Sequence, residues 1–201
     1  TLVSPVFISQ SSTAPYAYVA SRAHHADVGG MTPGSMPIAR EIFQEGLIIP
    51  PVKLVKAGQI DQELFSLILT NVRTPQERSG DLWAQISANR RGANRLSELA
   101  RLNGEAIVAQ YMEELLLYTE RMTRNLLYRL PDGEYRFTDY LDDDGLGNGP
   151  IPITVVLKIQ ADEAIVDFSQ SAPQQKGSIN AVYAITLSAV NYVFRCLLGI
   201  D

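Results

Sequence analysis

The sequence contains very little cysteine and histidine. Its 201 residues include one cysteine, Cys196, and two histidines, His24 and His25. One cysteine excludes an intrachain disulfide framework and any zinc site built from several cysteines, and it fits a reducing compartment such as the cytoplasm. Two histidines cannot complete a closed tetrahedral metal site, so such a site also needs carboxylates or ligands from outside this sequence.

Long apolar runs and clusters of basic residues are missing as well. No stretch of about eighteen apolar residues occurs, so no transmembrane helix is expected. Lys and Arg number 17 against 22 Asp and Glu, for a formal net charge of -5, and the arginines are interleaved with acids. Nucleic-acid binding needs clustered cations, so this balance argues against it.

The first residues have neither an initiator methionine nor the regions of a signal peptide, and they resemble the middle of a strand. With 46% hydrophobic and 19% charged residues, the composition is that of a globular protein. We therefore expect a cytoplasmic, internal fragment of a longer protein, in which residues 1–201 are part of a single domain.

The order of local patterns predicts an α+β fold, with small β-sheet segments at both ends around a long antiparallel helical hairpin. Residues 2–8 and 16–21 have the β-branched and aromatic content of strands. The polar residues 10–15 connect them, and the glycines and prolines of residues 29–37 exclude a long regular element there.

Residues 61–130 have helical periodicity. A first helix follows the acidic residues 61–63. A second is predicted to begin at Pro75, with Thr74 as the N-cap and Glu77 completing a capping box, and to run to about residue 102.

After Asn103-Gly104, a third helix is predicted from its apolar stripe between residues 107 and 127. Two long helices joined so closely indicate an antiparallel hairpin.

The last third of the chain returns to strands and ends in a helix. Three segments have the alternating pattern of strands: residues 134–141, 151–159 and 164–168. The acidic loop 142–149 lacks the alternating ligands of a calcium-binding loop and is interpreted as a solvated turn. Residues 181–198 form an apolar helix on which Cys196 is expected to be buried and inert.

His24, His25 and Asp27 lie within residues 21–30, which also hold two adjacent glycines. Imidazole and carboxylate groups suit zinc, manganese or iron. In an extended segment His25 and Asp27 share one face and His24 lies on the other, so a metal would meet one histidine. The spacing leaves two interpretations open, a partial metal site or a pair of histidines hydrogen-bonded within the fold.

Two further groups of residues are less specific. A polar stripe follows one face of the second predicted helix: Arg78, Asp81, Gln85 and Asn89. Its side chains either line a pocket or bond a neighbouring loop. Glu41 and Glu45 are candidate ligands, acid/base groups or ion-pair partners.

A series of motifs extends along the chain from residue 21 to residue 169. After residues 21–30 come Pro33-Gly34-Ser35-Met36-Pro37, Glu41-Ile42-Phe43-Gln44-Glu45-Gly46, Ile49-Pro50-Pro51-Val52-Lys53-Leu54, Asn71-Val72-Arg73-Thr74-Pro75, Gly80-Asp81-Leu82, Pro131-Asp132-Gly133, Leu141-Asp142-Asp143-Asp144-Gly145 and Asp167-Phe168-Ser169. Together they resemble the signature of the hydantoinase B/oxoprolinase family over essentially the whole chain. One departure is Gln170, which stands where the family usually has glycine.

This resemblance implies an enzyme. Family members are the B subunit or domain of ATP-dependent hydrolases that open cyclic amides such as hydantoins and 5-oxoproline. They work in oligomers with a hydantoinase A-type subunit or domain, which binds ATP and phosphorylates the carbonyl.

The resemblance also implies a divalent metal (zinc, manganese or iron) in the full-length protein. Its ligands would be a His-x-x-Asp pair preceding residue 1 and one histidine of the adjacent pair, for which His24 is favoured over His25. Asp27, Glu41 and Glu45 would then be neighbouring or catalytic acid/base groups.

Three functions stay open on this basis. The first is a fragment of a cyclic-amide hydrolase, inactive alone because it lacks part of the metal site and the nucleotide-binding machinery. The second is a subunit of an ATP-dependent acetone or acetophenone carboxylase. The third is a non-catalytic domain retained for subunit assembly, in which the histidines are purely structural.

Overall fold

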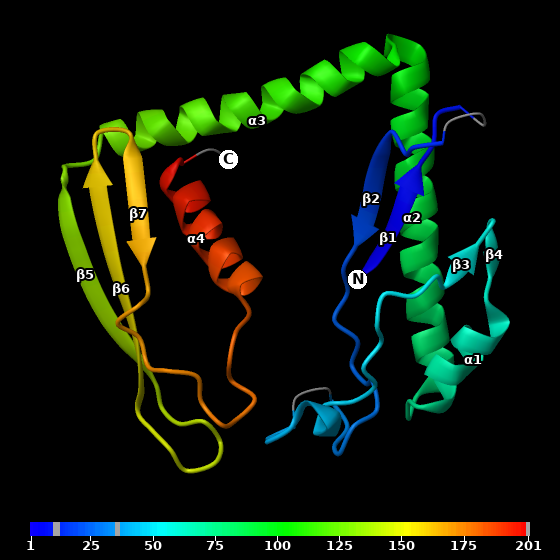
Figure 1. Cartoon of the computed structure of the whole chain (residues 1–201), viewed down its shortest axis with the longest axis horizontal. Coiled ribbons are helices and arrows are strands. Elements are labelled where there is room, and N and C mark those ends of the chain that lie inside the picture. Colours follow the sequence, from blue (N-terminus) through cyan, green and yellow to red (C-terminus); the bar gives the residue numbers. More distant parts are fainter. Residues whose placement is uncertain (10–12, 35–36, 200–201) are drawn as a thin grey trace. The chain divides into compact units, whose positions relative to one another are not determined.

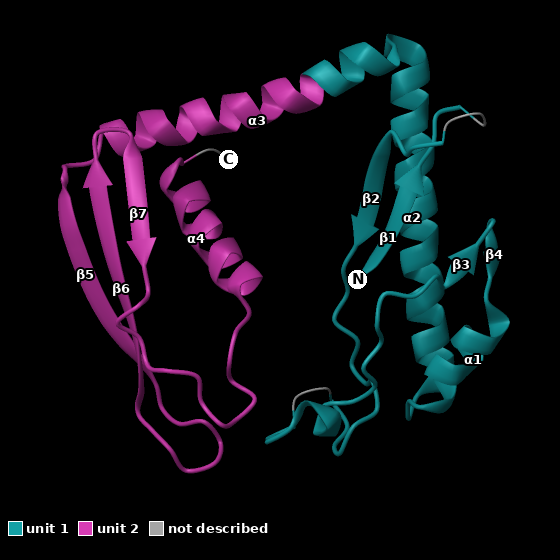
Figure 2. Ribbon diagram, viewed as in Figure 1, with its two compact units in different colours: residues 1–110 teal, residues 111–201 magenta. Residues whose placement is uncertain are grey.

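The structure, a computed structural model, describes residues 1–9, 13–34 and 37–199. It divides into two compact units, residues 1–110 and residues 111–201 (Figure 2). Part of the predicted connection 10–15, and Ser35-Met36 of the first motif, lie outside the described residues. The assignment of the whole chain to one domain stays a prediction.

Unit 1 is built around one long helix, α2 (Pro75–Asn103), which carries a β-hairpin on its surface (Figure 1). In this hairpin β1 (Leu2–Val6) pairs antiparallel with β2 (Ala17–Ser21). The other elements of unit 1 are η1 (Ile42–Gln44), β3 (Val55–Lys56), β4 (Gln59–Ile60) and α1 (Gln62–Thr70). The two predicted strands and the first two predicted helices are therefore confirmed.

The core of unit 1 joins α1 to the first half of α2. Leu54, Phe65 and Ile86 are buried together, and partly buried side chains from β1, β4 and α1 pack around them. The ring of Phe65 meets Trp83 edge-on, with the ring centroids 6.3 Å apart. Each large apolar side chain buried in this way contributes about 1.5–3 kcal/mol to folding. This cluster therefore fixes the part of α2 on which the candidate site is built.

Helix α2 begins at Pro75 as predicted, but the predicted capping box is wrong. Thr74 makes no cap hydrogen bond through its side chain. The Glu77 carboxylate instead pairs with the next residue, 3.3 Å from Nη2 of Arg78. A charged guanidinium is a stronger hydrogen-bond donor than a backbone N–H, which explains the exchange of partners.

Helix α3 (Glu105–Tyr128) follows after Gly104, where the backbone leaves α2 with φ 92°. The third predicted helix is thus confirmed. Because α3 passes from unit 1 into unit 2, its antiparallel packing against α2 stays a prediction.

Unit 2 contains an antiparallel sheet in the order β5-β6-β7 and a final helix (Figure 1). Its elements are β5 (Gly133–Leu141), β6 (Ile151–Gln160), β7 (Glu163–Asp167) and α4 (Tyr183–Leu197). All four were predicted, with bounds that differ by one or two residues. Together with unit 1 they confirm the α+β fold class.

The acidic loop between β5 and β6 is a turn, but one of its carboxylates is buried rather than solvated. Asp144 accepts hydrogen bonds from the side-chain amide of Asn148 at 2.7 Å and from the backbone N–H groups of Leu146 and Asn148. The Asn148 amide and these N–H groups hold the pKa of the Asp144 carboxyl below its usual value. This carboxylate therefore stabilises the loop.

The prediction for Cys196 is wrong, because its side chain on α4 is exposed. Every residue of α4, all of which the structure describes, stays at least partly exposed to solvent. The sequence pattern was that of a buried helix, but within unit 2 this face of it stays exposed. Among the described helices, none is long and apolar enough to cross a membrane.

Candidate functional site

The candidate site is the irregular segment that follows β2, residues 22–31, which contacts α2, the residues between α1 and α2, and the η1 turn. All four side chains of the polar stripe that the sequence predicted on α2 are buried or half-buried, and three of them, Asp81, Gln85 and Asn89, contact other elements of unit 1. The structure resolves the alternative left open above, because these side chains bond the β1–β2 hairpin and the segment after it.

Gln85 and Asn89 attach the hairpin to α2. Asn89, 3% exposed, donates to the backbone oxygen of Leu2 and to the hydroxyl of Ser4, both at 3.1 Å. Gln85 donates to the backbone oxygen of Ser21 at 3.4 Å, and the Ser21 hydroxyl donates to the Gln85 backbone oxygen at 3.5 Å. Buried amides need such partners, and an uncharged amide costs less to bury than a carboxylate or an ammonium group.

His25 is held between two side chains of α2. Its Nε2 lies 3.2 Å from Oε1 of Gln85, and its Nδ1 lies 3.6 Å from a carboxylate oxygen of Asp81. The side chain is 18% exposed. Metal binding through Nε2 would require His25 to give up its contact with Gln85. His24, by contrast, is exposed beside it.

Asp27 is the best-buried residue of the segment, at 5% exposure. Its carboxylate accepts from the backbone N–H of Arg73 at 2.6 Å and from the Arg73 guanidinium at 2.8 Å. The backbone N–H and the guanidinium of Arg73 hold the pKa of the Asp27 carboxyl below its usual value. Both carboxylate oxygens are thus occupied by Arg73, and the group stays ionised.

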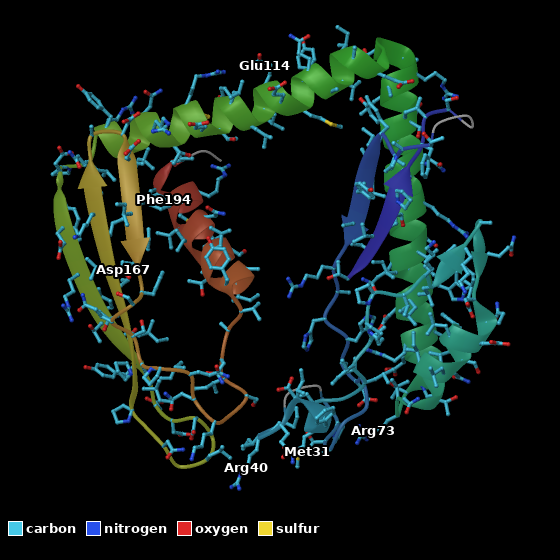
Figure 3. All side chains as sticks on the ribbon, in the orientation of Figure 1. Met31, Arg40, Arg73, Glu114, Asp167 and Phe194 are labelled. Atoms are coloured by element: carbon cyan, nitrogen blue, oxygen red, sulfur yellow. The ribbon has the colours of Figure 1, made fainter. Side chains whose placement is uncertain are left out.

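Arg73 also donates to the backbone oxygens of Gly29 at 3.3 Å and Gly30 at 2.8 Å. One side chain therefore contacts three successive parts of the segment, close to Met31 (Figure 3). A planar guanidinium suits this role because its donors are fixed in a fork. No local spacing pattern predicts this pair, because its members are 46 positions apart, although Arg73 belongs to one of the family-like motifs.

The two adjacent glycines allow the segment to touch the η1 turn at backbone distance. Both have φ +84°, and a Cβ atom on Gly30 would lie 2.7 Å from the backbone oxygen of Gln44. The Met31 N–H donates to that same oxygen, and the Leu47 N–H donates to the oxygen of Val28, each at 2.9 Å. Side chains in such positions would clash, so this close approach requires glycine.

Because of this contact, the η1 turn and the two residues that flank it, Glu41 and Glu45, lie beside the histidine segment. Both glutamates are exposed, and neither forms an ion pair with a residue that the structure describes. Their roles as acid/base groups stay predictions. The same holds for Asp27, whose geometry is that of a positioning group.

Arg78, the first member of the predicted polar stripe, is a buried arginine that completes the cluster. The Arg78 side chain is 8% exposed and contacts Asp81 at 3.1 Å and Glu77 at 3.3 Å. Its Nε has no hydrogen-bond partner among the described residues. Arg78 thereby occupies the Asp81 carboxylate that also faces His25.

The His, Asp and Glu side chains near His24 can be compared with what a metal ion needs. Within residues 1–9, 13–34 and 37–199, no three His, Cys, Asp or Glu side chains come together in a way that could hold a metal ion. The nearby carboxylates of Asp27 and Asp81 are engaged by Arg73 and Arg78. These residues therefore do not form a complete metal site on their own.

The chain is similar in sequence to several known proteins. The chain is 34% identical to 5-oxoprolinase 1 of Arabidopsis thaliana, over 100% of this chain and 18% of that protein. It is 40% identical to caprolactamase subunit beta of Pseudomonas jessenii, over 84% of this chain and 29% of that protein.

The solved structure of the ATP-dependent caprolactamase from Pseudomonas jessenii is similar in fold. It superimposes with a TM-score of 0.77 at 39% identity, over 84% of this chain and 29% of that chain. Across the curated relatives, this chain spans between 14% and 35% of their length. The family model "Hydantoinase B/oxoprolinase" matches residues 1–201, and the chain belongs to that family.

Proposed function

We propose that this chain is part of the B-type subunit or domain of an ATP-dependent hydrolase that opens cyclic amides. The observation that carries the proposal is the family match over all 201 residues, together with 40% identity to a caprolactamase subunit. Relatives named oxoprolinase, caprolactamase and hydantoinase share a ring amide as their substrate class. The proposed reaction is hydrolysis of the ring C–N bond.

The chain's own residues fit a role in presenting one ligand. Gln85 holds the chain before His24 through the Ser21 oxygen, and Arg73 holds it after His24 through Asp27, so that the exposed His24 lies between two attached points. We propose His24 as a ligand to a divalent cation (zinc, manganese or iron) whose other ligands lie outside this chain. His25 and Asp27 then position the segment through Gln85, Asp81 and Arg73.

ATP use belongs to a partner in this proposal. The caprolactamase and hydantoinase relatives are named as subunits, and the solved caprolactamase is ATP-dependent. We propose a hydantoinase A-type subunit or domain as the partner that activates the ring carbonyl with ATP. The 201-residue chain alone is then inactive.

The test uses a longer protein that contains this chain, with and without its A-type partner. Caprolactam, 5-oxoproline and hydantoin are supplied with ATP, and ring-opened product and ADP are quantified together. Product is expected from at least one ring, and only when both partner and ATP are present. His24→Ala is expected to lower kcat/KM by about 100-fold or more, because loss of even the outer partners of a metal ligand typically costs about 10–100-fold. It is also expected to lower the amount of bound metal measured by mass spectrometry.

Lys176→Ala, which replaces an exposed lysine outside residues 21–31 and outside the family-like motifs, serves as the control and should leave both readouts unchanged. ATP-dependent ring opening by the 201-residue chain alone would contradict the proposal. Bicarbonate-dependent carboxylation of a ketone without any ring opening would replace it by the carboxylase alternative. Unchanged metal content and activity in His24→Ala would overturn the ligand assignment.

A further inference from the structure

The sheet of unit 2 has one apolar face, and much of that face is uncovered. The register places Tyr135 opposite Leu157, and Phe137 opposite Val155, on the same side of the sheet. Along β6 the alternation adds Ile153 to this side. Tyr135, Phe137 and Ile153 are nevertheless 44%, 66% and 42% exposed.

Helix α4 has the same character. Ser188, Asn191 and Arg195 follow one another at i, i+3 and i+7 and form a narrow polar stripe. The rest of the circumference is largely apolar, yet Tyr192 is 71% exposed and Val193 is 55% exposed. A helix that is apolar over most of its surface is typical of a protein interior.

The total exposed area indicates how much surface needs a cover. The chain exposes 14636 Å². Two separate compact domains with the sizes of unit 1 and unit 2 would expose about 11,000 Å² in total. The exposed area is larger than this by more than the area buried in a standard protein–protein interface, about 1,600 Å².

We propose that the apolar face of the β5-β6-β7 sheet and the apolar surface of α4 pack against further segments of a longer polypeptide that contains this chain. The solved caprolactamase provides the first argument, since the part that matches this chain is 29% of its length and the remainder is available in cis. The second argument is composition. Non-obligate interfaces, between partners that also exist apart, are about as polar as the rest of a protein surface, whereas α4 has the composition of a domain core.

Cys196 provides a probe for this cover. It is the single cysteine of the chain and is exposed on α4, on the side shared by Ile185, Ala189 and Tyr192. The longer protein, purified without any partner subunit, is treated with N-ethylmaleimide under native conditions, and labelling at Cys196 is followed by mass spectrometry. Labelling is expected to be about 100-fold or more slower than in the denatured protein, because the thiol reacts only through local opening.

A matched control reports the polar stripe of the same helix. Ser188→Cys in a Cys196→Ser background is expected to label rapidly both in the 201-residue chain and in the longer protein. Slow labelling at Cys196 with rapid labelling at position 188 then shows that one side of α4 is covered.

Three outcomes would overturn the proposal. Rapid native labelling of Cys196 in the longer protein would show that no cis segment covers α4. Protection that begins only when an A-type partner is added would assign the surface to a subunit interface. Protection in the 201-residue chain that rises with its concentration, together with a doubled molecular mass, would assign it to a second copy. None of these readouts depends on catalysis, so this inference and the proposed function fail separately.

Discussion

Unit 1 and unit 2 differ in how far their side chains are engaged by other elements of the same unit. In unit 1, side-chain hydrogen bonds join residues 46 to 87 positions apart, from Asp27 to Arg73 and from Asn89 to Leu2. In unit 2 the helix α4 buries none of its residues, although its sequence is largely apolar. Unit 1 satisfies Asp27 and Asn89 with partners from its own elements, whereas α4 of unit 2 leaves apolar side chains exposed.

The strongest way to test this difference is to remove a buried side chain from unit 1. Ile86→Ala is expected to cost about 2–5 kcal/mol in the free energy of unfolding, because it leaves a cavity beside Leu54 and Phe65. Val193→Ala on α4 is expected to change that free energy by about 0.5 kcal/mol or less, since the side chain is 55% exposed. Urea denaturation followed by the fluorescence of Trp83, the single tryptophan, monitors unit 1, and hydrogen exchange monitors α4.

Equal losses at Ile86 and Val193 in the 201-residue chain would remove the basis of the comparison. The same pair in a longer protein sharpens it. If a cis segment covers α4, Val193→Ala costs more there than in the isolated chain, while the cost of Ile86→Ala stays the same.

The next largest effect is expected at Gly30. Alanine there must adopt a left-handed backbone, at a cost of about 1–2 kcal/mol, and its Cβ would lie 2.7 Å from the Gln44 oxygen. The η1 turn is therefore expected to separate from residues 28–31. The measurement is hydrogen exchange at Met31 and Leu47, whose N–H groups bond the two segments to each other. Exchange at both positions is expected to be faster.

Gly34→Ala is the matched control. Gly34 also has a positive φ, +95°, but a Cβ there has nothing within 4 Å. It should show the conformational cost without the faster exchange at Met31 and Leu47. If Gly34→Ala accelerates exchange at those positions as much as Gly30→Ala does, the close approach is not what fixes the segment.

The smallest expected effect is a dependence on pH in unit 1. Since the folded state holds the pKa of Asp27 below its ordinary value of 3.8, the ionised carboxylate adds stability above that value and loses it as the pH falls through the lower, folded value. The difference in unfolding free energy between the native chain and Asp27→Asn should therefore narrow as the pH is lowered from 7 toward 3. Urea denaturation at a series of pH values measures it.

An Arg73→Gln background separates the two donors of this interaction. The guanidinium is then absent while the backbone N–H at position 73 still donates, so the pH-dependent difference is expected to be weaker but present. A difference that is the same at pH 7 and pH 3 would show that the Asp27 charge contributes nothing to unit 1.

The sequence predicted the elements better than the contacts between them. Pro75, Gly104 and the alternation of β5 and β6 act over a few residues, and such local signals define where helices and strands begin and end. The pairing of Asp27 with Arg73 depends on how α1 and α2 pack, which no local pattern contains. The sequence therefore indicated residues 21–30 as a candidate site but not Arg73 as the residue that holds them.

The error at Cys196 has a different origin. The pattern of α4 is correct for a buried helix, but burial also requires a covering element, and the described part of unit 2 leaves this helix exposed. The polar stripe of α2 shows the reverse case. Its amides looked ambiguous on the helix surface and became interpretable once Ser21 and Leu2 were seen to be their partners.

The hydrogen bonds of Arg73 also constrain the number of residues in the segment that it contacts. Its guanidinium donates to the Asp27 carboxylate and to the oxygens of Gly29 and Gly30, so these three contacts together fix the register of residues 27–30 relative to the start of α2. Inserting one residue between Asp27 and Gly30 would leave at least one of these acceptors out of reach. A tag or sensor loop intended for this family belongs elsewhere, because here the chain length itself is part of the contact.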